Sequence, residues 1–250
     1  MTSNVNHTVL ADAICRRCGF KWQTLPIILP FLSGPILPSV CDVCDGEIQS
    51  AKRAQIEKAE TDRQHARLQQ REKAWAKLCP IEYRLTTEAD GRTEIARLEL
   101  LNPKLKEILA WQFGSRGLII RSRASGRGKT RSAWRLLRKH WLHERTIAFY
   151  TAGMFQRKAQ DAAHNYQVEA WFNKLATVDI VFLDDLGKGN WTENTEATWF
   201  DLVEIRTSNG RPVIVTTNFK GDDLEENSRS ETTEFTVRRL REFCDVITLD

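Results

Sequence analysis

The chain has 250 residues, of which 41% are hydrophobic and 28% are charged, and its formal net charge is +4. This content is ample for a buried core, and the length accommodates one core domain with a small appendage. A weakly positive charge permits contact with nucleic acid but does not predict it. Residues 1–13 contain no basic segment followed by an apolar run, so we expect no signal peptide and predict a cytoplasmic protein. Because prolines interrupt the short apolar stretch at residues 25–40, we expect no membrane span.

Four of the six cysteines form two CxxC pairs, which are Cys15 with Cys18 and Cys41 with Cys44. Each pair presents two sulfurs to one ion, and four thiolates complete the tetrahedral shell that Zn²⁺ accepts. A redox motif, which needs only one pair, and a set of reduced buried cysteines are the alternatives. The spacing predicts a structural zinc-ribbon-like module over residues 1–46. Cys79 and Cys244 stand alone, and we expect them to be apolar core residues.

Residues 47–99 form a predicted helical linker region. From Gly46 to about Leu78 the sequence is rich in helix-forming residues and contains no proline, so a long helix is expected. Its apolar stripe is thin, which favours a solvated linker helix. The alternative is a basic stripe for nucleic acid or an acidic partner, because Arg63, Arg67 and Arg71 share one helix face.

Apolar strands alternate with helices over residues 100–250. A short helix is expected from Asn102 to about Gln112. The continuous apolar character of the strands and the helix-length connections between them predict an α/β domain, in which helices cover both faces of a five-stranded parallel sheet. The expected strands are 117–121, 146–150, 178–183, 212–216 and 245–249.

The first strand leads into a glycine-rich segment and then a helix, which is the arrangement of a phosphate-binding loop (P-loop). Glycine-rich backbone around a helix N-terminus offers a ring of N–H donors in a positive field. Lys129 is expected to reach the β and γ phosphates, and the Thr130 hydroxyl to ligate Mg²⁺. The alternative is a strand-to-helix turn with a chance Lys-Thr, since Arg123 stands where the full pattern has glycine. The expected ATP-binding residues of the loop are Ser125, Gly126, Arg127, Gly128, Lys129 and Thr130.

The third expected strand ends in two carboxylates, Asp184 and Asp185. A Mg²⁺ shell requires such oxygens, whereas a solvated loop does not. We expect Asp184 to hold the Mg²⁺ shell and Asp185 to polarise the attacking water. Many enzymes of this kind have Glu at the second position. Because Asp185 is one methylene shorter, weak turnover is an alternative.

These motifs resemble AAA+ ATPases of the DnaC-type helicase-loader and IstB-type transposition-helper branch. The resemblance covers about residues 100–250 and is carried by the GRGKT and LDDLG motifs, the strand 212–218 and the segment Val237–Leu240. It implies a P-loop NTPase fold of the AAA+ type. It also implies that Asn218 is the sensor-1 residue and that Arg239 is an arginine finger acting on a neighbouring subunit, with Arg238 as the competing candidate. The N-terminal cysteines are similar to zinc modules of some bacterial and phage helicase loaders.

The resemblance implies a DNA replication protein that loads or remodels a replicative helicase on single-stranded DNA. ATP, Mg²⁺ and Zn²⁺ are its expected cofactors, and an ATP-dependent homo-oligomer is its expected assembly. The alternatives are an IstB-like helper with a transposase as partner, and an adaptor that binds ATP and barely hydrolyses it. The catalytic residues would be Lys129, Asp185, Asn218 and Arg239. Single-stranded DNA could contact a basic and aromatic set, with solvated helix faces as the alternative: Arg131, Arg135, Arg138, Lys139, Phe155, Arg157 and Lys158.

Overall fold

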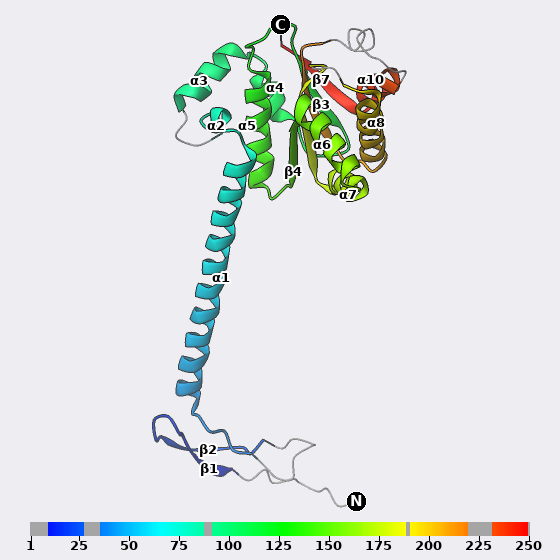
Figure 1. Cartoon of the computed structure of the whole chain (residues 1–250). Helices are drawn as coiled ribbons and strands as arrows, with labels where there is room; N and C mark the ends of the chain where they lie inside the picture. The colour runs from blue at the N-terminus through cyan, green and yellow to red at the C-terminus, as the bar shows by residue number, and fades with distance from the viewer. Residues whose placement is uncertain (1–9, 28–35, 88–91, 189–190, 220–231, 250) are drawn as a thin grey trace, which may run out of the picture. The chain divides into compact units, whose positions relative to one another are not determined.

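The computed structural model describes residues 10–27, 36–87, 92–188, 191–219 and 232–249 (Figure 1). The chain divides into two compact units, residues 1–72 and 73–250. Three segments with limits after residues 46 and 99 had been expected. The difference arises because residues from Lys73 onward pack within the second unit.

The first unit contains a β-hairpin and most of a long helix. Strands β1 (Ala11–Ile14) and β2 (Lys21–Thr24) are antiparallel, and α1 spans Asp42–Leu78. A long helix was predicted from Gly46 onward; it begins four residues earlier, at Asp42, and therefore contains Gly46. Part of the apolar stretch 25–40 lies outside the described residues. No helix among those that the structure describes is long and apolar enough to cross a membrane.

The second unit is built on a five-stranded, all-parallel sheet with the order β4-β5-β6-β3-β7. This confirms the predicted α/β architecture, with strand limits that differ by up to a few residues. The P-loop strand β3 is separated from β5, which carries the two aspartates, by the single strand β6. The strands are β3 (Gly117–Arg121), β4 (Ile147–Thr151), β5 (Ile180–Leu186), β6 (Val213–Thr217) and β7 (Cys244–Thr248).

Side-chain alternation along the strands divides the core into two clusters. In β5, Ile180 and Phe182 belong to one cluster, and Val181 and Leu183 belong to the other. Successive strand residues point to opposite faces, so a strand that is apolar at every position must be covered on both. The result is a three-layer arrangement, with α5 on one side of the sheet and α6, α7 and α8 on the other (Figure 1).

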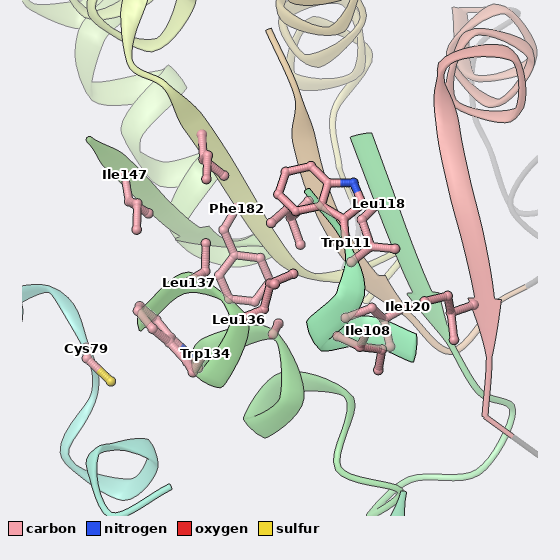
Figure 2. Packing of buried hydrophobic residues seen from close by; sticks show 14 of the residues in the cluster. Cys79, Ile108, Trp111, Leu118, Ile120, Trp134, Leu136, Leu137, Ile147 and Phe182 are labelled. Atoms are coloured by element: carbon pink, nitrogen blue, oxygen red, sulfur yellow. The ribbon is translucent and has the colours of Figure 1, made fainter. Parts of the chain in front are cut away.

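The helices that follow the strands have their apolar residues at helical spacing. In α5, Trp134, Leu137 and Trp141 recur at three- and four-residue intervals and pack toward the sheet, where Trp134 and Leu137 lie near Phe182 (Figure 2). The helices of the unit are α2 (Ile81–Arg84), α3 (Arg92–Leu101), α4 (Leu105–Ala110), α5 (Lys129–Leu142), α6 (Ala152–His164), α7 (Val168–Thr177), α8 (Glu193–Ser208) and α10 (Thr232–Phe243).

Residues 73–87 are attached to α5 by aromatic and hydrogen-bonding contacts. The Trp75 and Trp134 rings meet edge to face, with 5.6 Å between their centroids. Arg131 donates to the Glu82 carbonyl and Arg135 to the Thr86 carbonyl, each at 3.0 Å. This segment is therefore part of the α/β unit rather than of a separate linker.

These contacts correct the expected DNA-binding set. Besides Arg131 and Arg135, Arg138 lies over the Trp75 ring at 5.2 Å and Lys139 donates to the Leu109 carbonyl at 3.1 Å. Phe155 is fully buried in the second cluster. The four basic groups therefore hold the unit together. Of that set, Arg157 and Lys158 on α6 are the members that are exposed.

A buried guanidinium joins the ends of α7, β5 and β6. Arg206 of α8 is fully buried and donates to four carbonyls, at distances from 2.5 to 2.9 Å. The acceptors are the carbonyl oxygens of Leu175, Val178, Asp179 and Pro212. Carbonyl groups that would otherwise be buried without donors are satisfied by one side chain.

His140 predicts a pH dependence of stability. It is buried against the Trp111 ring, and burial, helped by Lys139, His143 and Arg145, lowers its pKa to about 4. Below pH 6.5 the unfolded chain binds a proton that the folded chain excludes, so stability falls as the pH drops toward 4. We expect the unfolding free energy to decrease by about 1 to 2 kcal/mol between pH 7 and pH 5 from this group.

Urea unfolding at the two pH values measures the effect. His140→Gln should reduce the pH slope, whereas His164→Gln, at an exposed position of α6, should leave it intact. An unchanged slope in His140→Gln would contradict the assignment.

Candidate functional site

The loop between β3 and α5 has the backbone of a phosphate-binding turn. Gly126 and Gly128 have φ of +79° and +77°, a region that side chains other than glycine rarely adopt. A Cβ on Gly128 would also lie 2.7 Å from the Leu98 side chain of α3. Gly128 caps the N-terminus of α5, so Lys129 and Thr130 occupy the first helical turn, where the helix field favours anions.

Lys129 is buried, and no carboxylate of the described residues pairs with it. Its Nζ donates to the Ala124 carbonyl at 3.2 Å and lies 3.5 Å from the Ser122 carbonyl. Burial lowers its pKa, and the nearby Asp185 opposes this shift. A buried ammonium that contacts only neutral carbonyls is well suited to receive a phosphate anion.

Asp184, at the end of β5, contacts both neighbouring elements of the site. Thr130 Oγ1 donates to Asp184 Oδ1 at 2.8 Å, and Thr216 Oγ1 of β6 donates to the same oxygen. Burial raises the pKa of the Asp184 carboxyl. The predicted Mg²⁺ ligands, a hydroxyl and a carboxylate, are therefore adjacent, and these oxygen donors are those that Mg²⁺ prefers.

Asp185 is held in an unusual backbone conformation. Its φ is +60°, and the pairing of β5 with β6 shifts register between Leu183 and Leu186. Its amide donates to Thr216 Oγ1 at 2.9 Å, and its carboxylate accepts from Lys188 Nζ at 2.9 Å. Such irregularities at a strand end re-aim a side chain and are concentrated at functional sites.

Asn218 follows β6, beside β5. Its Oδ1 is buried and has no hydrogen-bond partner among the residues that the structure describes. Because a buried acceptor without a donor is costly, this atom is ready to bind a ligand or a water molecule.

A pocket of about 220 Å³ brings most of the predicted residues together. The cations Arg127, Lys129, Arg131 and Lys188 line it, against the carboxylate of Asp185. This excess of positive charge suits a polyanion such as a triphosphate. Arg123, which departs from the glycine pattern, is exposed and does not line the pocket. The full lining is Tyr83, Leu101, Ser125, Gly126, Arg127, Gly128, Lys129, Thr130, Arg131, Asp185, Lys188 and Asn218.

Several residues of the site were not predicted from the sequence. Thr216 binds both aspartates, and Tyr83 and Leu101 supply an apolar wall from the segment before β3. Asn102 supports the loop indirectly, because it donates to Ser132 Oγ, which donates to the Gly128 carbonyl. Of these residues, Thr216 is the one that the sequence could have indicated, because it lies two positions before the predicted site residue Asn218.

Arg239 lies on α10 and does not line this pocket. Its guanidinium pairs with both carboxylate oxygens of Glu204 on α8 and approaches Glu242 at 3.4 Å. The hydrogen bonds from Arg239 lower the pKa of Glu204. Arg238, the competing candidate, is exposed, with its guanidinium 5.3 Å from the Phe235 ring.

The two CxxC pairs of the first unit form one cluster, in which the four sulfurs lie within 4.8 Å of one another. Cys15 and Cys18 lie in the turn between β1 and β2, where Gly19 has φ of +76°. Cys41 directly precedes α1 and Cys44 lies in its first turn, so the second pair belongs to a helix start rather than to a separate turn.

The cluster geometry fits Zn²⁺. Cys18 Sγ and Cys41 Sγ are 3.7 Å apart, and a tetrahedral site with Zn–S bonds of about 2.3 Å places its sulfurs about 3.8 Å apart. Backbone hydrogen bonding, chiefly at Cys41, lowers the pKa of the Cys15 thiol to about 6. Four sulfurs would complete the shell of the ion, which suits a structural role and leaves no open position for catalysis.

The chain is similar to several solved protein structures. No protein-family model and no curated protein matches the sequence. AMPPCP-bound DnaA from Aquifex aeolicus is 17% identical over 59% of this chain and 45% of that chain, with a TM-score of 0.49. The DnaC helicase loader is 15% identical over 65% of this chain and 92% of that chain, and DnaI is 17% identical over 65% and 87%, both with TM-scores of 0.49.

The chain spans less than half of the full length of the AMPPCP-bound DnaA structures to which it is similar. At 15 to 17% identity and TM-scores of 0.49, these likenesses do not extend to activity or partners. The parallel sheet and the glycine-rich loop between β3 and α5 independently give residues 73–250 the architecture of a P-loop NTPase.

Thr216→Val tests the support of the acidic pair. Removing the hydroxyl takes a donor from buried Asp184 and an acceptor from the Asp185 amide, so the part of the ATP affinity that depends on Mg²⁺ should fall about tenfold, or 1.4 kcal/mol. ATP titrations with Mg²⁺ and with EDTA measure this part. Thr217→Val is the matched control, since Thr217 Oγ1 donates to the Leu186 carbonyl. Equal losses with and without Mg²⁺ would contradict the assignment.

Metal analysis tests the cysteine cluster. The purified protein should contain about one zinc ion per chain, and Cys41→Ser should lose most of it because three sulfurs leave the shell incomplete. Cys79→Ser, at a buried cysteine of the α/β core, should retain the metal. A wild-type protein that neither contains zinc nor takes it up on titration would exclude the site.

Proposed function

We propose that this chain is an ATP-dependent DNA replication protein that loads or remodels a replicative helicase on single-stranded DNA in the cytoplasm. The observation that carries the ATPase part is the gathering of Lys129, Asp185 and Asn218 around one cationic pocket, beside the Thr130–Asp184 pair. The helicase part rests on the motif resemblance described above, from the P-loop through Val237–Leu240.

The loop residues bind the triphosphate in this proposal. Backbone amides from Gly126 to Thr130 surround the phosphates, and Lys129 replaces its carbonyl contacts with β- and γ-phosphate oxygens. Thr130 and Asp184 would hold Mg²⁺, which would neutralise phosphate charge when bound. Tyr83 and Leu101 border the pocket and exclude water from one side.

Asp185 and Asn218 would act on the attacking water. Asp185 accepts a hydrogen bond from the water, and the buried Oδ1 of Asn218 orients it toward the terminal phosphate. The strained φ of Asp185 fixes where its short side chain can reach. Because the Asp185 side chain is one methylene shorter than that of Glu, the isolated chain should hydrolyse ATP slowly, as the adaptor alternative also expects.

Arg239 is proposed to complete the site of a neighbouring subunit in an ATP-dependent homo-oligomer. In the single chain it pairs with Glu204, and both side chains are about one third exposed. An ion pair with this exposure contributes little net free energy, so an incoming γ-phosphate can compete for the guanidinium. Single-stranded DNA is proposed to contact Arg157 and Lys158, which are exposed on α6.

Lys129→Ala tests the proposal directly. Losing the ammonium should lower ATP affinity at least tenfold and abolish ATP-dependent loading of the replicative helicase of the native host onto single-stranded DNA. Lys174→Ala, at an exposed position of α7, is the matched control and should behave as wild type. The measurements are ATP titration and a loading assay with purified helicase.

Three other outcomes separate the alternatives. No ATP binding by the wild-type chain would refute the whole proposal. ATP binding with capture of a transposase instead of a helicase from the native host would favour the transposition helper. Mixing Lys129→Ala with Arg239→Ala chains should restore part of the hydrolysis that each lacks. A mixture as inactive as its components would exclude Arg239 as a residue that acts between subunits.

A further inference from the structure

Lys188 is a cation of the pocket to which the proposed mechanism gives no contact with the nucleotide. It follows β5 in a tight turn, where its amide donates to the Asp185 carbonyl at 3.0 Å and Gly187 has φ of +89°. This turn directs the side chain back, so that Nζ lies 2.9 Å from Asp185 Oδ2. Both residues line the pocket that also contains Lys129.

The Lys188–Asp185 pair can be exchanged at little cost. The two side chains are 50% and 34% exposed, and ion pairs with such access to water contribute little to stability. A triphosphate carries more charge than a single carboxylate, and charge-assisted hydrogen bonds to phosphate are among the strongest that a lysine makes. Lys188 can therefore separate from Asp185 and pair with a phosphate instead.

The position of Lys188 beside Asp185 indicates which phosphate it would bind. In the proposed function, Asp185 lies beside the water that attacks the terminal phosphate. A lysine whose Nζ is within hydrogen-bonding distance of Asp185 is therefore close to that phosphate. The same lysine also acts electrostatically on Lys129, whose pKa it helps to lower.

We propose that Lys188 recognises the terminal phosphate of ATP. Its ammonium pairs with Asp185 when the pocket is empty and with the γ-phosphate when ATP is bound, and this exchange releases the Asp185 carboxylate to accept a hydrogen bond from water. ADP has no γ-phosphate, so it leaves the Lys188–Asp185 pair intact. Lys188 then makes the site selective for ATP over ADP and makes the availability of Asp185 depend on ATP. This inference rests on the proposed ATPase function.

The test compares ATP and ADP affinities of wild type, Lys188→Met and Lys188→Arg in the presence of Mg²⁺. Lys188→Met keeps the length of the side chain and removes its charge, so ATP affinity should fall about tenfold while ADP affinity stays within about twofold. Lys188→Arg restores a cation and should recover most of the preference for ATP. Lys174→Met, on the exposed face of α7, is the matched control and should change neither affinity.

A second readout separates recognition from a structural role. Thermal unfolding of nucleotide-free Lys188→Met should match wild type within a few degrees, because the pair it removes is exposed. Equal loss of ATP and ADP affinity, or no loss of either, would overturn the inference even if ATP binds. Failure of the wild-type chain to bind either nucleotide would instead refute the proposed function, so the two failures are distinguishable.

Discussion

The carboxylate of Asp184 is the interaction on which the arrangement of the site depends. It is buried at the end of β5 and accepts hydrogen bonds from Thr130 on α5 and Thr216 on β6. Three elements that are distant in sequence are therefore joined at one oxygen atom. Because a buried carboxylate without donors would be costly, the pairing fixes the P-loop helix relative to the strand tips, and the positions of Asp185 and Asn218 follow from it.

Much of the architecture could be predicted from the sequence for a simple physical reason. Strands that are apolar at every position, such as Ile180–Leu183, must be covered on both faces, and glycines such as Gly126 and Gly128 are required where φ is positive. Paired CxxC spacing likewise predicted which four sulfurs meet. These signals are local, because each depends on a few neighbouring residues.

The rest of the site depends on contacts that no local pattern reports. Arg131 and Arg135 resemble solvated helix charges in the sequence, yet they bind carbonyls 49 residues away. In the sequence, nothing distinguishes Thr216 from other strand threonines, and its contact with Asp185 exists because β5 and β6 are neighbours in the sheet. The contact of Lys188 with Asp185 depends on the turn that follows β5. The start of α1 at Asp42 was missed because Gly46, a poor helix former, lies inside the helix.

The attachment of residues 82–86 to α5 also constrains how this protein can vary. Arg131 and Arg135 are one helical turn apart, and their acceptors, the carbonyls of Glu82 and Thr86, are separated by the same four residues. Since the acceptors are backbone atoms, substitutions at Glu82 or Thr86 preserve both bonds. Inserting or deleting one residue between them would break the match, so these two bonds constrain the length of the segment rather than the side chains of the two acceptor residues.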